Sequence, residues 1–301
     1  QVLVESARKV TGGAGAGVFE QGAGALDVVA AFHLLSSYTP RASLLPPTLN
    51  LTDPYMWPYS RQPLFHGGKP AVFNVTVANG MGVTGYIRGV SYTEDRSSRG
   101  YYDDVDMLDV QVEYDPVLWP WSGYLAISLG VPRAASGFEG VVTGMVQVLV
   151  ESDPGPGETQ LRSSNIHLPI VVNVAATPPR QKRLLWDQFH SVSYPSAYTP
   201  RDYLGDDSDM LDRHGDHPYT NFRSLFNKLL DAGYYVDVLG SDWTCFEAED
   251  YGALLMVDLE DEMGEKEKRK LENDVKEKGL SLVIFADWYS REQMAQVVLS
   301  V

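Results

Sequence analysis

The chain has little cysteine, no long apolar run and a shortage of positive charge. Cys245 is its single cysteine, so no disulfide can form within the chain and no Cys-x-x-Cys metal motif exists. No run of about 18 apolar residues occurs, so the sequence predicts no membrane-spanning helix. Its 24 Lys and Arg residues are outnumbered by 40 Asp and Glu residues, which gives a net charge of −16. This balance argues against a nucleic-acid partner, which needs a basic face.

The remaining composition is that of a folded protein. Hydrophobic residues make up 44% of the 301 residues and charged residues 21%, which is enough apolar material for the cores of about two domains. The chain opens in a helical pattern at Gln1, without a signal peptide, and closes inside an amphipathic pattern at Val301. We therefore expect a piece of a longer protein, cut at both ends.

The first 70 residues divide into a helical part and a proline-rich part. Residues 1–38 are predicted to be helical, with positive φ angles or close backbone approach at Gly22 and Gly24. Asp27 is predicted to stabilise the following helix as an N-cap or as a first-turn carboxylate. Residues 39–70 hold seven prolines interleaved with aromatic residues. The prolines favour an irregular strap without strands or helices, and the aromatic rings favour an ordered strap over a flexible linker.

Residues 71–178 alternate apolar and polar side chains with the period of a strand, which predicts an antiparallel β-sandwich. Residues 152–164 are predicted to form a polar hairpin loop. The expected strands are 71–77, 107–114, 124–131, 141–150 and 166–174.

Residues 179–301 alternate strands with helices, which predicts an incomplete, doubly wound parallel α/β domain of the flavodoxin or amidotransferase type. Glycines at 233 and 279 are predicted to end two of the helices. The expected strands are 183–187, 234–239, 253–257 and a buried strand 280–285, and the expected helices are 220–232, 265–278 and 291–298. The fold class is thus α+β with several domains.

Three groups of residues in the α/β part could carry chemistry. Asp187 and Asp258 end two expected parallel strands, where ligands bind in such folds, so they are candidates for a small-ligand crevice. Cys245 could be a hydrolase nucleophile, but no small-residue elbow surrounds it, so a packed or partner-linked thiol is favoured. The His214–His217 cluster lacks a fourth ligand, and we interpret it as a polar loop and not as a metal site.

Several rare strings along the chain resemble the site-1 protease family of subtilisin-like serine endopeptidases. The Gly22–Ala31 segment is similar to the closing helices of a subtilisin-type catalytic domain. The resemblance continues in the same order through Pro54-Tyr-Met-Trp-Pro-Tyr59, Leu118-Trp-Pro-Trp-Ser122 and Leu185-Trp-Asp-Gln188. It implies that residues 1–38 end a catalytic domain, that 39–70 are a strap, that 71–178 are a sandwich and that 179–301 are a truncated α/β domain.

The resemblance implies a protease function for the parent protein only. The family's triad of Asp, His and a Ser in a Gly-Thr-Ser loop has no counterpart in this chain. No catalytic residue, metal site or cofactor is therefore assigned here, although the family implies Ca²⁺ in the parent protease. The family pattern has a cysteine on each side of the Pro-Tyr-Met-Trp-Pro-Tyr string, and here those places hold Asp53 or its neighbour on one side and Ser60 on the other.

Further expectations follow from the resemblance. The parent would act in the lumen of the Golgi and endoplasmic reticulum on membrane-bound transcription factor precursors, anchored by a segment beyond residue 301. The sequons at Asn50 and Asn74 would be glycosylated there. This part of the chain would scaffold its own catalytic domain through Trp57 and the Trp119–Trp121 string, and the alternative is a binding module with no protease role. Cys245 could pair with a cysteine beyond Val301.

Overall fold

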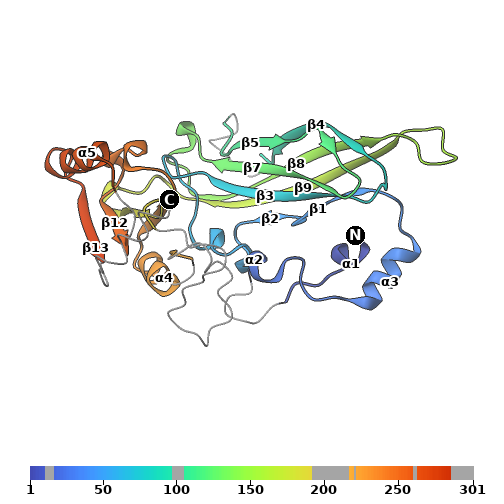
Figure 1. Ribbon diagram of the computed structural model, residues 1–301, viewed down its shortest axis with the longest axis horizontal. Helices are drawn as coiled ribbons and strands as arrows, with labels where there is room; N and C mark the ends of the chain where they lie inside the picture. The colour runs from blue at the N-terminus through green and yellow to red at the C-terminus, as the bar shows by residue number, and fades with distance from the viewer. Residues whose placement is uncertain (11–16, 97–104, 192–216, 220–221, 260–262, 286–301) are drawn as a thin grey trace, which may run out of the picture. The chain divides into compact units, whose positions relative to one another are not determined.

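The computed structural model describes residues 1–10, 17–96, 105–191, 217–219, 222–259 and 263–285 (Figure 1). They belong to two compact units, Gln1–Thr177 and Pro178–Val301.

The first unit is a β-sandwich of two sheets. One sheet has the order β1-β3-β7-β5, with strands Ala42–Leu45, Ala71–Asn79, Ser122–Gly130 and Asp109–Tyr114. The other has the order β2-β9-β8-β4-β6, with strands Leu49–Asn50, Arg162–Val174, Gly140–Ser152, Gly85–Glu94 and Val117–Leu118. Every pairing is antiparallel except that of β2 with β9. The predicted antiparallel sandwich is therefore confirmed.

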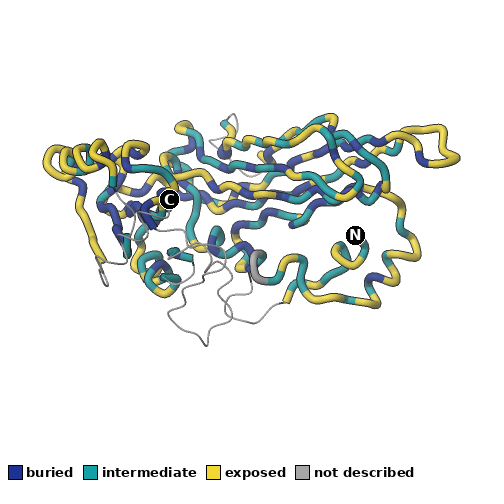
Figure 2. The backbone as a smooth tube through the Cα atoms, in the orientation of Figure 1, coloured by how far each residue is buried: buried dark blue, intermediate teal, exposed yellow. Residues whose placement is uncertain are grey.

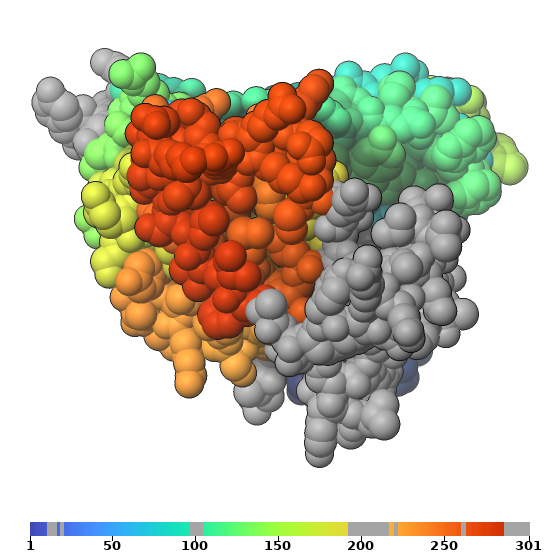
Figure 3. Space-filling model, turned by 60° about the vertical axis from the view of Figure 1, so that its left-hand side comes forward, coloured from blue at the N-terminus to red at the C-terminus, as the bar shows by residue number. Residues whose placement is uncertain are grey.

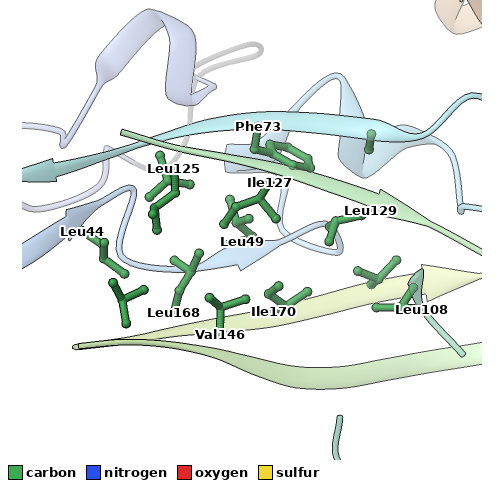
Figure 4. Packing of buried hydrophobic residues seen from close by; sticks show 14 of the residues in the cluster. Leu44, Leu49, Phe73, Leu108, Leu125, Ile127, Leu129, Val146, Leu168 and Ile170 are labelled. Atoms are coloured by element: carbon green, nitrogen blue, oxygen red, sulfur yellow. The ribbon is translucent and has the colours of Figure 1, made fainter. Parts of the chain in front are cut away.

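The core of the sandwich forms where the inward-facing residues of the two sheets meet. Leu125 and Ile127 of β7 lie opposite Leu168 and Ile170 of β9 (Figure 4), and all four are fully buried. Burying an aliphatic side chain of this size stabilises the folded state by roughly 1.5–3 kcal/mol. Alternation along each strand places these residues inside, because successive side chains of a strand point to opposite faces.

The prediction that prolines exclude strands from residues 39–70 is wrong. Strand β1 pairs with β3 in a register that places Leu44 opposite Val77, and Leu49 of β2 is fully buried. The prolines at 46 and 47 lie between β1 and β2, outside both ladders. Strand β4 was also not foreseen, because a bulge between Ile87 and Gly89 shifts its alternation.

The N-terminal segment holds three short helices, α1 (Val2–Glu5), α2 (Val18–Gln21) and α3 (Val28–Ser36). The predicted cap is confirmed, since the Asp27 side chain accepts a hydrogen bond of 2.9 Å from the Ala30 backbone N–H. Gly22 and Gly24 have the expected positive φ angles of 56° and 106°. A Cβ atom on Gly24 would lie 2.2 Å from the Arg8 carbonyl oxygen, so only glycine fits there.

The second unit is a parallel sheet in the order β11-β10-β12-β13. Its strands are β10 (Arg183–Asp187), β11 (Tyr235–Leu239), β12 (Ala253–Val257) and β13 (Ser281–Phe285). Helix α4 (Arg223–Asp231) joins β10 to β11, and α5 (Glu265–Lys276) joins β12 to β13. Two 3₁₀ turns, η7 (Trp243–Cys245) and η8 (Ala248–Asp250), lie between β11 and β12. The predicted parallel α/β arrangement is confirmed for these residues.

Both faces of this sheet are covered by apolar groups. Leu184 and Trp186 pack with Phe226 of α4 on one face, while Leu185 and Trp243 belong to the cluster on the other face. Gly233 and Gly279 follow α4 and α5 with φ angles of 78° and 66°, as predicted for residues that end helices. Neither helix extends to the limits foreseen, and α5 carries the ion pairs Glu272–Lys276 and Glu265–Lys268 on its surface.

The expectation that the strand from Leu280 to Phe285 is buried is wrong for β13. Ile284 is 62% exposed and Phe285 46%, because β13 ends the sheet and has β12 as its one neighbour among the described strands. Figure 2 shows β13 as an exposed segment, and Figure 3 shows the red surface of α5 and β13. The expected helix at 291–298 lies outside the described residues. Within them, no helix is long and apolar enough to cross a membrane.

Candidate functional site

The most polar part of the α/β core lies at the carboxyl end of β10, around Asp187. Its Oδ1 accepts the backbone N–H groups of Phe189 and His190 at 3.0 and 3.2 Å. Its Oδ2 lies 2.8 Å from His190 Nδ1 and accepts the indole N–H of Trp243 at 2.6 Å. Asp187 and His190 are almost completely buried. The predicted position of Asp187 at a strand end is correct, but its carboxylate is occupied by the protein's own donors.

His190 lies between two carboxylates. Its Nδ1 faces Asp187, and its Nε2 lies 3.0 Å from Oε1 of Glu267, in the first turn of α5. Burial lowers the pKa of His190, but the hydrogen bond to Asp187 and the charges of Asp187 and Glu267 outweigh burial, so the pKa is raised. A neutral ring would direct a lone pair at one of the two carboxylates. The arrangement therefore favours an imidazolium that donates its Nδ1–H to Asp187 and places its positive charge beside Glu267.

Glu267 extends this cluster to the loops. Its Oε1 accepts the backbone N–H of Trp243 at 3.1 Å, and its Oε2 accepts that of Gly264 at 2.8 Å. The ring of Trp243 lies 4.6 Å from that of His190. One imidazolium thus ties β10, η7 and α5 together. His190, Trp243 and Glu267 are not evident as a site in the sequence, where the only local signal is a histidine three residues after a strand-ending aspartate.

Asp258 directly follows β12. In the order β11-β10-β12-β13, the chain goes from β10 to one side and then returns to the other side at β12, so the strand order reverses between β10 and β12. Strand ends at such a reversal are where α/β folds commonly bind ligands. Asp258 has a φ of 50°, which is the one positive value among the described residues other than glycine. Its backbone N–H donates to the Phe285 carbonyl at 2.9 Å. Asp187 and Asp258 thus end adjacent strands, but their environments differ, because Asp187 is fully enclosed and Asp258 is half-buried.

Cys245 is an exposed thiol at the end of η7. Its Sγ lies 3.8 Å from Oδ1 of Asp242 and 4.0 Å from the Thr244 hydroxyl. Hydrogen bonds from Thr244 lower the pKa of Asp242, so a carboxylate faces the sulfur. The contacts of this sulfur are with Asp242 and Thr244, and neither is the imidazole base that activates a cysteine nucleophile.

The histidine cluster at 214–217 lies outside the described residues except for His217. The Nδ1 atom of His217 accepts the Tyr219 backbone N–H at 3.0 Å. In the part of the chain that the structure describes, no group of three or more His, Cys, Asp or Glu residues could hold a metal ion.

The N-terminal segment presents an apolar surface, which we call the α3 face: Val28, Val29, Phe32 and Leu35. Each of these side chains is more than 60% exposed, and Ala31 is the one buried residue of α3. Glu5 anchors the segment to the start of β1 through an ion pair with Arg41 at 2.5 Å. Burial raises the pKa of Glu5, but hydrogen bonds from Arg41 and its neighbours outweigh burial, and the pKa is lowered. Tyr55 adds a second anchor, since its hydroxyl donates to the Gly22 carbonyl.

Comparison with known proteins relates both units to one family. Residues 45–177 match the family model described as "MBTPS1, third Ig-like domain", and residues 178–299 match "MBTPS1, fourth GATase-like domain". The chain is 48% identical over 305 residues to the human membrane-bound transcription factor site-1 protease. It is 46% identical over 298 residues to subtilisin-like protease SBT6.1 of Arabidopsis thaliana.

The chain belongs to the site-1 protease family. Each of these alignments covers 99% of this chain but 28% of the relative's length. The chain therefore corresponds to the Ig-like and GATase-like domains of a much larger protease. A family 123 glycoside hydrolase from Clostridium perfringens also matches in structure, at a TM-score of 0.27 and 9% identity over 65% of this chain and 33% of that chain, which is too low for any argument.

Two aromatic features that the resemblance to site-1 proteases singled out differ in exposure. Trp57 is half-buried. Trp119 and Trp121 are 52% and 70% exposed, and their rings stack with centroids 6.2 Å apart. Exposed aromatic pairs of this kind are enriched at protein interfaces.

The two sequons in this site-1 protease segment also differ. Asn50 is half-buried, and its side-chain oxygen accepts both the backbone N–H and the hydroxyl of Thr52, at 3.0 and 2.6 Å. Asn74 is exposed on the outward face of β3. Asn74 therefore presents a free amide to solvent, whereas the Asn50 amide oxygen is held in a turn.

Proposed function

We propose that this chain is a non-catalytic part of a subtilisin-like serine endopeptidase and that it supports the catalytic domain of that protease. The family assignment and the domain names of the two matching family models support the first half of the proposal. A serine protease needs a serine hydroxyl beside an imidazole that a carboxylate orients. The one buried imidazole bonded to a carboxylate in the described residues is His190, and both of its ring nitrogens face carboxylates.

The α3 face carries the second half of the proposal. A helix in a soluble domain normally turns its apolar stripe inward, but α3 leaves Phe32 68% exposed and Leu35 63% exposed. The segment is nevertheless held in place by the Glu5–Arg41 ion pair. A fixed apolar surface of this kind marks a contact with another part of a protein. Because the relatives are much longer than this chain, we assign that contact to their catalytic domain.

The biology of the whole protease follows from the same family assignment. The name that the relatives share supports membrane-bound transcription factor precursors as substrates, and hence a role in regulated proteolysis. We also propose a lumenal Golgi and endoplasmic reticulum location, with glycosylation at Asn74 in preference to Asn50. We propose Ca²⁺ for the parent protease only, and no described residue of this chain is proposed to hold it.

A labelling experiment tests the inactive character of the chain. The purified chain is incubated with a fluorogenic peptide library and, separately, with a fluorophosphonate that labels activated serines. We expect no hydrolysis above a heat-denatured sample and no labelled band. Labelling of any serine, or hydrolysis blocked by a thiol reagent at Cys245, would contradict the proposal.

Substitutions on the α3 face test the scaffolding role. In the full-length protease, Phe32→Ser and Leu35→Ser together should lower the melting temperature and the yield of active enzyme, because they weaken the contact with the catalytic domain. Leu161→Ser is the matched control, since Leu161 is a 57% exposed leucine in a loop. Equal behaviour of the double variant and the control would overturn the proposed contact.

The two competing functions receive no comparable support. A small-ligand module at Asp187 and Asp258 would need both carboxylates to be free to bind, but Phe189, His190 and Trp243 already donate to Asp187. A cysteine hydrolase would need a base beside Cys245, where the structure places the carboxylate of Asp242.

A further inference from the structure

The outer edge of β5 is unpaired along the whole strand in the residues that the structure describes. Strand β5 ends its sheet with six residues, whereas β1 at the other end has four, and β2 and β6 at the ends of the second sheet have two each. In the described part of the chain no strand pairs with the side of β5 that faces away from β7. Figure 1 shows β5 beside β7. Proteins usually protect such an edge with charged side chains, proline, a bulge or a very short strand. Strand β5 has no proline, bulge or lysine, and its two charged residues, Asp109 and Glu113, are both acidic.

Strand β5 is already ordered in the strand conformation that pairing requires. It runs in unbroken antiparallel register with β7 from Asp109, opposite Gly130, to Tyr114, opposite Leu125. The chain enters it through a clamp, because the buried carboxylate of Glu94 accepts the backbone N–H groups of Met107 and Leu108 at 3.0 and 3.3 Å. An added strand would therefore not have to order β5, which is the main entropic cost of binding at a flexible edge.

The two faces of β5 differ in chemistry. Val110, Val112 and Tyr114 pack against the sandwich core but remain half exposed. Asp109, Gln111 and Glu113 point outward and are exposed. Their partners across the strand pair are Gly130, Ser128 and Ala126, which carry no charge. The carboxylates of Asp109 and Glu113 thus form an acidic row without a basic partner on β7.

We infer that the β5 edge binds an extended peptide by strand addition, and that the peptide alternates apolar residues with Lys or Arg. Backbone hydrogen bonds to the free edge would supply affinity, as in other cases of strand addition. The peptide's apolar side chains would cover Val110, Val112 and Tyr114. Its basic side chains would lie on the outer face beside Asp109 and Glu113, at the cross-strand Cβ spacing of about 5 Å.

A synthetic peptide of alternating lysine and valine, labelled with a fluorophore, tests this inference by fluorescence polarisation with the full chain. Two control peptides carry backbone N-methyl groups on every second residue, one on its valines and the other on its lysines. A third control has the same composition with its lysines grouped. Every second backbone N–H of an added strand points toward β5, so only one of the two N-methyl peptides loses these hydrogen bonds. We expect the unmodified alternating peptide and the other N-methyl peptide to bind. The peptide with blocked N–H groups and the grouped peptide should bind at least tenfold more weakly. Equal binding of all four would show attraction by net charge alone and would overturn the inference.

Protein variants locate the site. Asp109→Asn and Glu113→Gln should each weaken binding by about two- to fivefold, the effect of one exposed ion pair. Glu139→Gln and Asp153→Asn, at exposed positions outside β5, remove the same charge and should leave binding unchanged. Hydrogen exchange provides a second readout, since the peptide should slow exchange at amides of residues 109–114. Protection confined to any other strand would overturn the assignment to β5.

Discussion

The imidazolium of His190 should make the α/β unit most stable at mildly acidic pH. The pKa of His190 in the folded chain is raised above the value of about 6.5 that the unfolded chain would have. A group with a raised folded pKa contributes its full stabilisation below the unfolded pKa. That contribution is lost as the pH rises through the folded pKa. We therefore expect the unit to be less stable at about pH 9.5 than at about pH 6.

The size of the stability loss expected for a His190 variant follows from the burial of this ion pair. Substituting His190→Gln removes the cation from between Asp187 and Glu267, and the exposed fractions of the His190 and Asp187 side chains are 1% and 0%. Leaving such a carboxylate without its buried partner costs about 3–5 kcal/mol. For a unit of this size, the corresponding fall in melting temperature is roughly 10 °C or more. The difference between wild type and variant should be largest at the acidic end of the range and shrink at the alkaline end.

Urea denaturation combined with pulse proteolysis and mass spectrometry measures this effect, because the cleaved peptides report the unfolding of each unit separately. His33→Gln is the control, since His33 is an exposed histidine in the first unit. The reasoning would be refuted if wild type kept the same free energy of unfolding at both pH values. It would also be refuted if the His190→Gln penalty did not change with pH.

Two predictions concern the sandwich unit. Glu94→Gln should lower its free energy of unfolding by about 2 kcal/mol, because one of the two charge-assisted hydrogen bonds to Met107 and Leu108 is lost. The exposed change Glu139→Gln should stay within about 0.5 kcal/mol in the same thermal melts, and a Glu94→Gln value equal to it would disprove the clamp. Gly24→Ala should speed hydrogen exchange across residues 1–10, since the new Cβ would clash with the Arg8 carbonyl 2.2 Å away. Gly22→Ala meets nothing within 4 Å and should cost only about 1 kcal/mol for its positive φ, so equal exchange in the two variants would argue against the close contact.

The relation between prediction and structure differs between local and long-range features. Alternation predicted five strands of the sandwich, and strand–helix periodicity predicted the parallel unit, because burial on one face imposes a period on the sequence. The observed ends of these strands and helices differ from the predicted ends by a few residues, because hydrogen bonding and not residue propensity decides where an element ends. The strand β1 was missed because its apolar residues lie beside two prolines, and its pairing with β3 depends on residues far along the chain.

The candidate site shows the same division. Asp187 could be placed at a strand end from the sequence alone, but its neighbours could not. His190 follows it by three residues, whereas Trp243 and Glu267 come from η7 and α5 and meet it only once the sheet has formed. Whether that carboxylate is free to bind a ligand or is enclosed by its own chain is a matter of three-dimensional packing.

What the sequence by itself determined is the class of the two units, the caps and glycines that shape their turns, and the family, since these depend on residue types at fixed spacing. Only the tertiary structure decided which groups meet. It buried His190 between two carboxylates, exposed β13 at a sheet edge, left α3 with its apolar side chains in solvent and set β5 at the end of its sheet. Each of these outcomes arises from contacts between segments that are distant in the chain. A local sequence pattern does not predict such contacts, because their free energies depend on residues outside that pattern.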